Sequence, residues 1–83
     1  MDIRARIEKI KTPEDAEKQI TLAKQNAMRL RAEAKKQTTL AEKVASQEKV
    51  KLAERVMREL RRLIWDIEDV LAAGKPATSV LKN

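Results

Sequence analysis

The residues best suited to recognising a partner gather around the only aromatic side chain of this 83-residue chain, Trp65. Arg58, Arg61 and Arg62 precede it by seven, four and three residues, spacings that bring side chains together on one side of an α-helix. Guanidinium groups pair with phosphates and carboxylates, and an exposed indole offers a stacking surface. Two more basic residues continue this side of the helix towards the N-terminus. The predicted binding face is therefore Lys51, Arg55, Arg58, Arg61, Arg62 and Trp65.

Two structural interpretations of Trp65 compete with a binding role. In the first, the indole lies under the Arg61 side chain as a cation–π pair on the surface. In the second, it is covered by an N-terminal helix that carries Ile3, Ile7 and Ile10. Such a short helix cannot stand alone, so it needs a docking site.

Enzymatic chemistry has little support in this sequence. The chain has no His and no Cys, and so lacks the usual general base, the thiolate nucleophile and the commonest metal ligands. Asp66 and Asp69 share a helix face, where they could bind a cation or a partner's Lys or Arg, but we expect a solvated acidic patch. The sequence predicts a non-enzymatic protein with no metal, no cofactor and no small-molecule substrate.

The charge balance favours an acidic partner. There are 19 lysine and arginine residues against 13 aspartate and glutamate residues, a net charge of +6. No apolar run approaches the ~18 residues of a membrane span, so we expect a cytoplasmic protein without a membrane partner. A stripe of cations on the earlier part of the chain could follow a phosphate backbone. This secondary basic face consists of Lys24, Arg29, Arg31, Lys35 and Lys36.

Helices must position all of these residues. One Gly, two Pro and one aromatic residue argue against a β fold. The three isoleucines near the N-terminus recur at helical spacing, which predicts a short helix within residues 1–12. The last residues of the chain have no periodicity, and we expect residues 74–83 to form a flexible tail; the alternative is that Val80 and Leu81 dock on a neighbour.

A main helical region is predicted between these two ends, over residues 13–73. Thr12 is suited to the N-cap and Pro13 to the first helical position. Gly74 and Pro76 mark its end. A break is expected near 37–39, where Thr39 and Glu42 fit a capping box, or near 46–48. With a break the region is an antiparallel hairpin, and without one it is a long kinked helix.

Apolar residues follow this region at spacings of three and four, and in its second half they cover nearly half of the helix circumference. A hairpin leaves part of such a stripe open, so we expect self-association as a homodimer or larger bundle. The predicted oligomer seam is Ile20, Ala23, Ala27, Leu30, Val56, Leu60, Leu63, Ile64, Ile67 and Leu71.

The sequence therefore predicts an all-α protein with a coiled-coil-like bundle. Its function is predicted to be that of a small regulatory or accessory protein that binds nucleic acid through a basic helical face. One alternative is a protein-binding adaptor or inhibitor, for example a phage or plasmid factor that blocks a larger complex. A second alternative is a structural coiled-coil module with no other ligand.

Overall fold

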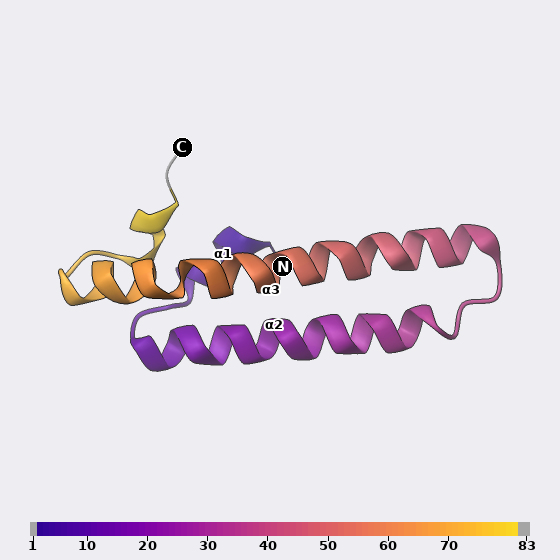
Figure 1. The fold of residues 1–83 in the computed structure, drawn as a ribbon, viewed down its shortest axis with the longest axis horizontal. Coiled ribbons are helices and arrows are strands. Elements are labelled where there is room, and N and C mark those ends of the chain that lie inside the picture. Colours follow the sequence, from indigo (N-terminus) through magenta and orange to yellow (C-terminus); the bar gives the residue numbers. More distant parts are fainter. Residues whose placement is uncertain (1, 82–83) are drawn as a thin grey trace.

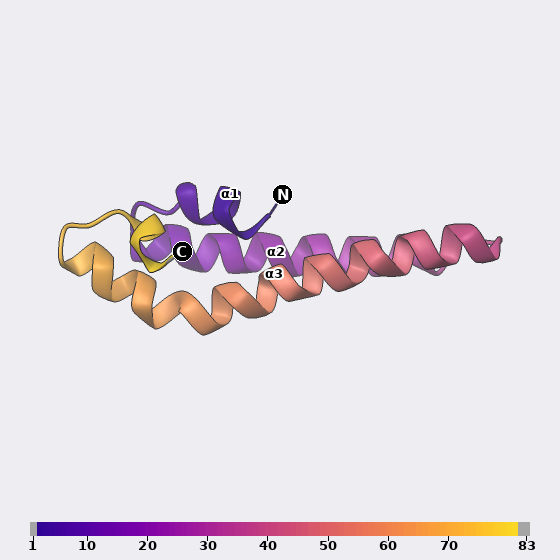
Figure 2. The same ribbon diagram turned by 90° about the horizontal axis from the view of Figure 1, so that it is seen from above.

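Two long antiparallel helices form the frame of the molecule, so the hairpin is the correct one of the two predicted arrangements. The computed structural model describes residues 2–81 (Figure 1). Within them the helices are α1 (Ile3–Glu8), α2 (Pro13–Ala34), α3 (Leu40–Ala72) and a short 3-10 helix, η1 (Ala77–Val80). Figure 2 shows α1 and η1 lying on the hairpin towards its open end. No helix within residues 2–81 combines the length and apolarity that crossing a bilayer requires.

The start of α2 is fixed by the predicted local signals. The Thr12 hydroxyl accepts a hydrogen bond from the Asp15 backbone N–H at 3.1 Å, and the Asp15 carboxylate accepts one from the Thr12 backbone N–H at 3.2 Å. This reciprocal capping box satisfies donors that a helix start leaves unpaired. Pro13 occupies the first turn, where its missing N–H removes no helical hydrogen bond.

The chain reverses at residues 35–39, which is the first of the two predicted breaks. Thr39 caps α3 by accepting a hydrogen bond from the Glu42 backbone N–H at 3.2 Å. The Glu42 carboxylate accepts from the Thr39 hydroxyl at 2.7 Å instead of closing the reciprocal bond to the backbone. The second predicted break, at 46–48, is wrong because α3 runs unbroken through it.

The predicted oligomer seam is used inside a single chain. Ala23, Leu60, Leu63 and Ile67 are buried in one core cluster, together with residues of α1 and η1. Other seam residues pack against this cluster or line the hairpin: Ile20, Val56, Ile64 and Leu71 are half-buried beside it, Ala27 is buried, and Leu30 is half-buried. These residues therefore pack against segments of their own chain. Self-association itself stays a prediction.

The covering elements are α1 and η1. In the N-terminal segment Ile7 and Ile10 are almost fully buried, and Asp2 caps α1 by accepting from the Ala5 backbone N–H at 2.8 Å. This segment closes one side of the apolar stripe that α2 and α3 leave open. The short helix predicted within residues 1–12 thus has its docking site on the hairpin core.

The flexible tail predicted for residues 74–83 is wrong for the part up to residue 81; residues 82–83 lie outside the described residues. Gly74 ends α3 with φ at +77°, a left-handed conformation that suits glycine. The chain then turns back to form η1, where Ala77 is buried and Val80 and Leu81 pack against the core. Val80 and Leu81 follow Ala77 by three and four residues. This helical spacing lets the short segment dock on the apolar stripe of the hairpin.

A buried cation holds α1 against α2. Arg6 is only 7% exposed, and its Nη1 donates to the Gln19 Oε1 at 3.2 Å. Its Nε has no hydrogen-bond partner among the described residues. Burial lowers the pKa of Arg6 because it disfavours the charged form. Sequence patterning did not predict this contact, because an arginine between isoleucines is normally solvent-exposed.

Candidate functional site

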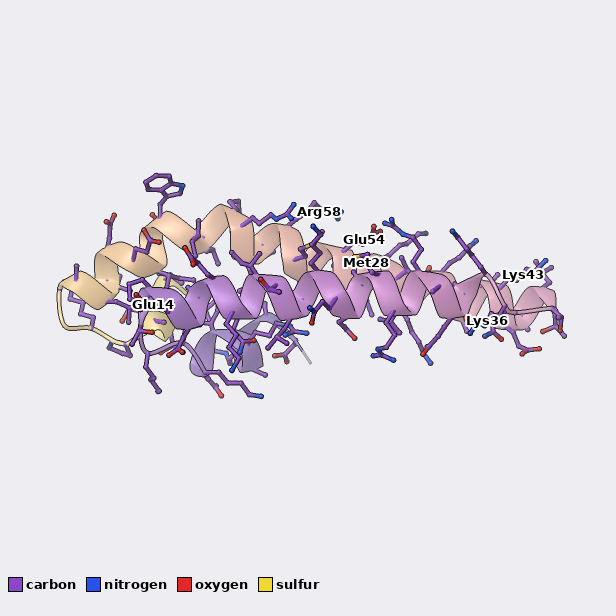
Figure 3. The ribbon with its side chains drawn as sticks, turned by 90° about the horizontal axis from the view of Figure 1, so that it is seen from below. Glu14, Met28, Lys36, Lys43, Glu54 and Arg58 are labelled. Atoms are coloured by element: carbon purple, nitrogen blue, oxygen red, sulfur yellow. The ribbon has the colours of Figure 1, made fainter. Side chains whose placement is uncertain are left out.

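The predicted basic face lies on the outer side of α3. All six of its residues are exposed, while Leu60, Leu63 and Ile67 of the same helix are buried. Because helical side chains repeat every 3.6 residues, the exposed set must point away from the core. Figure 3 shows Arg58 on the side of α3 that faces away from α2. The structure therefore places the predicted residues on one continuous surface, the α3 outer face: Lys51, Arg55, Arg58, Arg61, Arg62 and Trp65.

Trp65 is exposed to solvent at the end of this surface. Its side chain is 76% exposed, the second most exposed of the large apolar residues. The interpretation in which α1 covers Trp65 is wrong, because Ile3, Ile7 and Ile10 pack into the core instead. The surface pair of Trp65 with Arg61 stays a prediction. An indole left open in this way can contact another molecule without any rearrangement of the fold.

Two of the five basic residues on the α3 outer face are paired within α3. Arg62 Nη2 lies 2.8 Å from Glu59 Oε2, and Lys51 Nζ lies 3.7 Å from Glu48 Oε1. Within residues 2–81, no carboxylate comes within 4.0 Å of the cationic nitrogens of the other three. These three are Arg55, Arg58 and Arg61. Their guanidinium groups are available to an external anion.

Glu59 is surrounded by cations. The hydrogen bond from Arg62 and then its charge lower the pKa of Glu59, and Arg55 and Arg58 lower it further through their charges. The pKa of Arg62 is raised in return by the hydrogen bond and charge of Glu59, with a smaller contribution from Asp66. Arg62 alone pairs with Glu59, and the charges of Arg55 and Arg58 are left unpaired within the described part of the chain, so this part of the helix remains positive.

The charge changes sign beyond Trp65. Asp66 and Asp69 line a small hollow of about 270 Å³ between the end of α3 and η1. No group of three or more metal-ligating side chains occurs among residues 2–81. The positive face therefore ends at Trp65 and extends back to Lys51, about 20 Å along the helix axis.

The secondary basic face is divided by internal ion pairs. Arg29 pairs with Glu33 at 3.2 Å and donates to Asn26 at 2.7 Å, so it is engaged on its own helix. Arg31 pairs with Glu54 and links α2 to α3. These two residues act in the hairpin itself, which weakens the prediction that they form part of a phosphate-binding stripe.

The remaining members of the secondary face are exposed lysines without a carboxylate in reach among the described residues: Lys24, Lys35 and Lys36. Lys35 lines a hollow of about 350 Å³ between the helices together with Arg31 and Lys51. Lys51 is thus the point at which the secondary face meets the α3 outer face.

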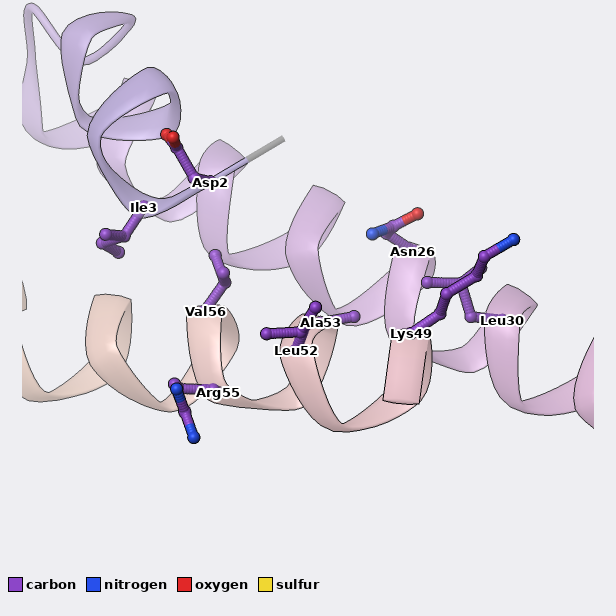
Figure 4. A pocket seen from close by; sticks show the side chains of 9 residues that line it. All are labelled: Asp2, Ile3, Asn26, Leu30, Lys49, Leu52, Ala53, Arg55 and Val56. Carbon is purple, nitrogen blue, oxygen red and sulfur yellow. The ribbon is translucent and has the colours of Figure 1, made fainter. Parts of the chain in front are cut away.

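Sequence reasoning missed a groove between α2 and α3 next to the start of α1. It has a volume of about 490 Å³, and its apolar wall includes Ile3, Leu52 and Val56 (Figure 4). Leu52 lies off the buried stripe and is 58% exposed, and Leu40 and Val44 are also exposed on α3. Of these three residues only Leu52 lines the groove, so Leu52 was the available signal. Where the groove lies depends on where α1 docks, which the pattern does not show.

Comparison with protein-family models, with curated proteins and with solved structures finds no match to this chain.

Proposed function

We propose that this protein binds nucleic acid through the α3 outer face. The observation that carries the proposal is the exposure of Trp65, the only aromatic residue of the chain, at the end of a row of arginines. Three of those arginines have no carboxylate partner among the described residues. An isolated surface tryptophan beside unpaired guanidinium groups offers both contacts that a nucleic-acid strand needs, stacking on a base and pairing with phosphates.

The dimensions of the face suit a single strand. Arg55 and Arg62 are separated by about 10 Å along the axis of α3, which lets the arginine row follow successive phosphates of an extended strand. Trp65 follows at the end of this row, where an unpaired base can reach its ring. A duplex keeps its bases stacked internally, so it would use only the arginines. We therefore expect tighter binding to single strands than to duplexes of the same length.

Sequence preference is expected to be weak. Phosphate contacts position a strand but do not read its bases, and one indole stacks on any base. The α3 outer face has no Asn or Gln among its six residues to recognise base edges. The proposed role is an accessory one, in which the protein coats or delivers a strand without selecting a particular site.

A triple substitution with a matched control tests the proposal. Arg58→Ala/Arg61→Ala/Arg62→Ala removes three charges from the α3 outer face, and Lys24→Ala/Lys35→Ala/Lys36→Ala removes three charges from the secondary basic face. In fluorescence anisotropy with a labelled single-stranded oligonucleotide, the first variant should bind at least about tenfold more weakly than the second. Equal losses in the two variants, with helix content unchanged in circular dichroism, would show that binding follows net charge and not this face.

A protein-binding adaptor or inhibitor is the second candidate function, and the same surface supports it. Trp and Arg are the residue types most enriched at the energetic centres of protein interfaces. In that case Trp65→Ala should abolish binding to the protein partner, and about 300 mM salt should change that binding little. Binding of a nucleic-acid strand, in contrast, is strongly weakened by salt. The structural coiled-coil alternative stays a prediction: the seam residues pack within the chain, and several of them are only half-buried there.

A further inference from the structure

The groove beside α1 is an apolar surface that the core covers only in part: Ile3 and Val56 pack against the core, whereas Leu52 is exposed. Its apolar residues come from three elements: Ile3 at the start of α1, Leu30 of α2, and Leu52 and Val56 of α3. The part on α3 runs from Lys49 to Val56, about 10 Å along the helix axis, or two helical turns. The groove is therefore large enough for a short helix and too short for a long one.

The position of α1 shows what kind of segment fits there. Towards the open end of the hairpin, α1 and the turn after it pack isoleucines at positions 3, 7 and 10 against α2 and α3. The groove begins where α1 begins, at Asp2 and Ile3, and continues between the same two helices (Figure 4). A second two-turn amphipathic helix placed there would meet the hairpin as α1 does, with branched apolar side chains facing inwards.

The charges at the rim select among possible occupants. Lys49 and Arg55 line the groove, and neither has a carboxylate in salt-bridge distance within residues 2–81. The opposing charge of Asp2 is directed to the start of α1, where its carboxylate accepts the Ala5 N–H. The unpaired charge along the rim is therefore positive.

A second copy of this chain is a poor match for that rim. Its most suitable segment, residues 2–11, carries four basic residues against two acidic ones, and would place cations next to Lys49 and Arg55. We propose that the groove binds a two-turn amphipathic helix of another protein, with branched apolar residues at α1-like spacing and acidic residues on its flanks. This inference is independent of nucleic-acid binding, although Arg55 borders both surfaces.

Two synthetic peptides test the proposal on the full chain. Both have the sequence of residues 2–11 with its three isoleucines, and both are cross-linked on their outer side because so short a helix is marginal in water. One keeps Arg4, Lys9 and Lys11, and the other has Glu at these three positions; both keep Arg6, which is buried against α2 in α1 itself. In anisotropy with labelled peptide, the acidic form should bind about tenfold or more tightly than the basic form, since the rim contacts change from repulsive to attractive.

Leu52→Gln and Leu40→Gln form a matched pair of protein variants. Both replace an exposed leucine of α3 without changing charge, but only Leu52 lines the groove. Leu52→Gln should weaken binding of the acidic peptide by about fivefold or more, and Leu40→Gln by less than about twofold. Neither change alters the cations of the α3 outer face, so oligonucleotide binding should be the same in both variants. The proposal for the groove and the proposal for the nucleic-acid interface can therefore be refuted separately.

Several results would overturn the groove proposal. Equal binding of the two peptides would show that the rim charges do not select the occupant. The absence of binding by either peptide, or equal losses in the two leucine variants, would show that the groove is not the site. A dimer in sedimentation that Leu52→Gln dissociates would assign the groove to a second copy of the chain.

Discussion

Two residues are exceptions to the rule that large apolar side chains are buried and charged side chains are exposed. Trp65, the largest apolar side chain, is exposed, and Arg6, a permanent cation, is buried. An exposed tryptophan contributes little to folding, which is why we assign it to binding. Arg6 makes one side-chain hydrogen bond, to Gln19, and its buried Nε has no partner among the described residues. Its role is to position α1, at a cost in desolvation.

Gln19 is predicted to matter more than its neutral side chain suggests. Gln19→Leu removes the acceptor of the buried guanidinium and should lower the free energy of unfolding by about 1–3 kcal/mol. The double variant Arg6→Met/Gln19→Leu removes both polar groups and should be at least as stable as Gln19→Leu alone. Chemical denaturation of the three proteins checks this prediction. A double variant that is less stable than Gln19→Leu would contradict the view that the buried cation is costly.

The Glu59–Arg62 pair gives a prediction about pH. The pKa of Glu59 lies below its ordinary value of 4.5 because of the hydrogen bond and charge of Arg62. The stabilisation from this pair is therefore present above pH 4.5 and is lost as the pH falls through the lowered pKa. In an NMR titration, Arg62→Gln should raise the pKa of Glu59, and Arg61→Gln should leave it nearly unchanged, since Arg61 does not contribute to the shift. Equal shifts in both variants would refute the specific pairing.

For single residues, the sequence predicts which face of a helix a side chain occupies better than it predicts which residue that side chain contacts. Spacings of three, four and seven were enough to place the arginines around Trp65, because helical periodicity alone determines that geometry. The pairing of Arg31 with Glu54 was out of reach, since it joins residues that are 23 positions apart and depends on the register of the hairpin. The burial of Arg6 was missed for the same reason, because it arises only after α1 docks on α2.

The sequence predicts where helices can begin, but it does not decide which of two possible starts the second long helix uses. Thr12 with Pro13 is a local signal that nothing contradicts, and α2 begins there. Thr39 and Ser46 are both local start signals, so the sequence left two breaks open. The hairpin core decides between them: a reversal at 35–39 lets Ala23 of α2 join Leu60 of α3 in one cluster. Ser46 is then simply a residue inside α3.

The capping box of α2 is expected to contribute measurably to stability. Thr12→Ala removes the acceptor of the Asp15 N–H and should cost about 1 kcal/mol. In a domain of this size that corresponds to a fall in melting temperature of about 4–8 °C. Thr38→Ala, at an exposed position outside the helices, is the control and should leave the melting temperature unchanged. Equal effects of the two substitutions in calorimetry would show that the cap is not the source.

At the scale of the whole molecule, the core and the proposed binding surfaces are unevenly distributed. The hairpin is elongated, with extents of 50 × 25 × 16 Å. The core cluster of α1, α2, α3 and η1 lies towards its open end, whereas the closed end consists of two helices with Leu40 and Val44 exposed. Amide exchange is therefore expected to be fastest around residues 35–45, because fewer buried contacts protect that end.

The positions of the short segments are the part of the architecture that sequence patterning missed. The apolar stripe is too wide for one neighbouring helix, and the sequence predicts that self-association covers the rest. Within the chain, the isoleucines at positions 3, 7 and 10 and the tail residues Ala77, Val80 and Leu81 cover part of it. Periodicity shows that a surface must be covered and does not show which segment covers it. Segments shorter than two turns give too weak a signal to be placed in advance.

The salt dependence of strand binding shows most sharply whether the α3 outer face binds nucleic acid. With labelled single-stranded oligonucleotide, about three to four phosphate contacts on the α3 outer face predict a slope of about −2 to −3 for log K against log salt concentration. Arg58→Ala/Arg61→Ala/Arg62→Ala should make that slope shallower, between about −1 and zero. A slope near zero in the unmodified protein, or an unchanged slope in the variant, would contradict the assignment of this face to nucleic acid.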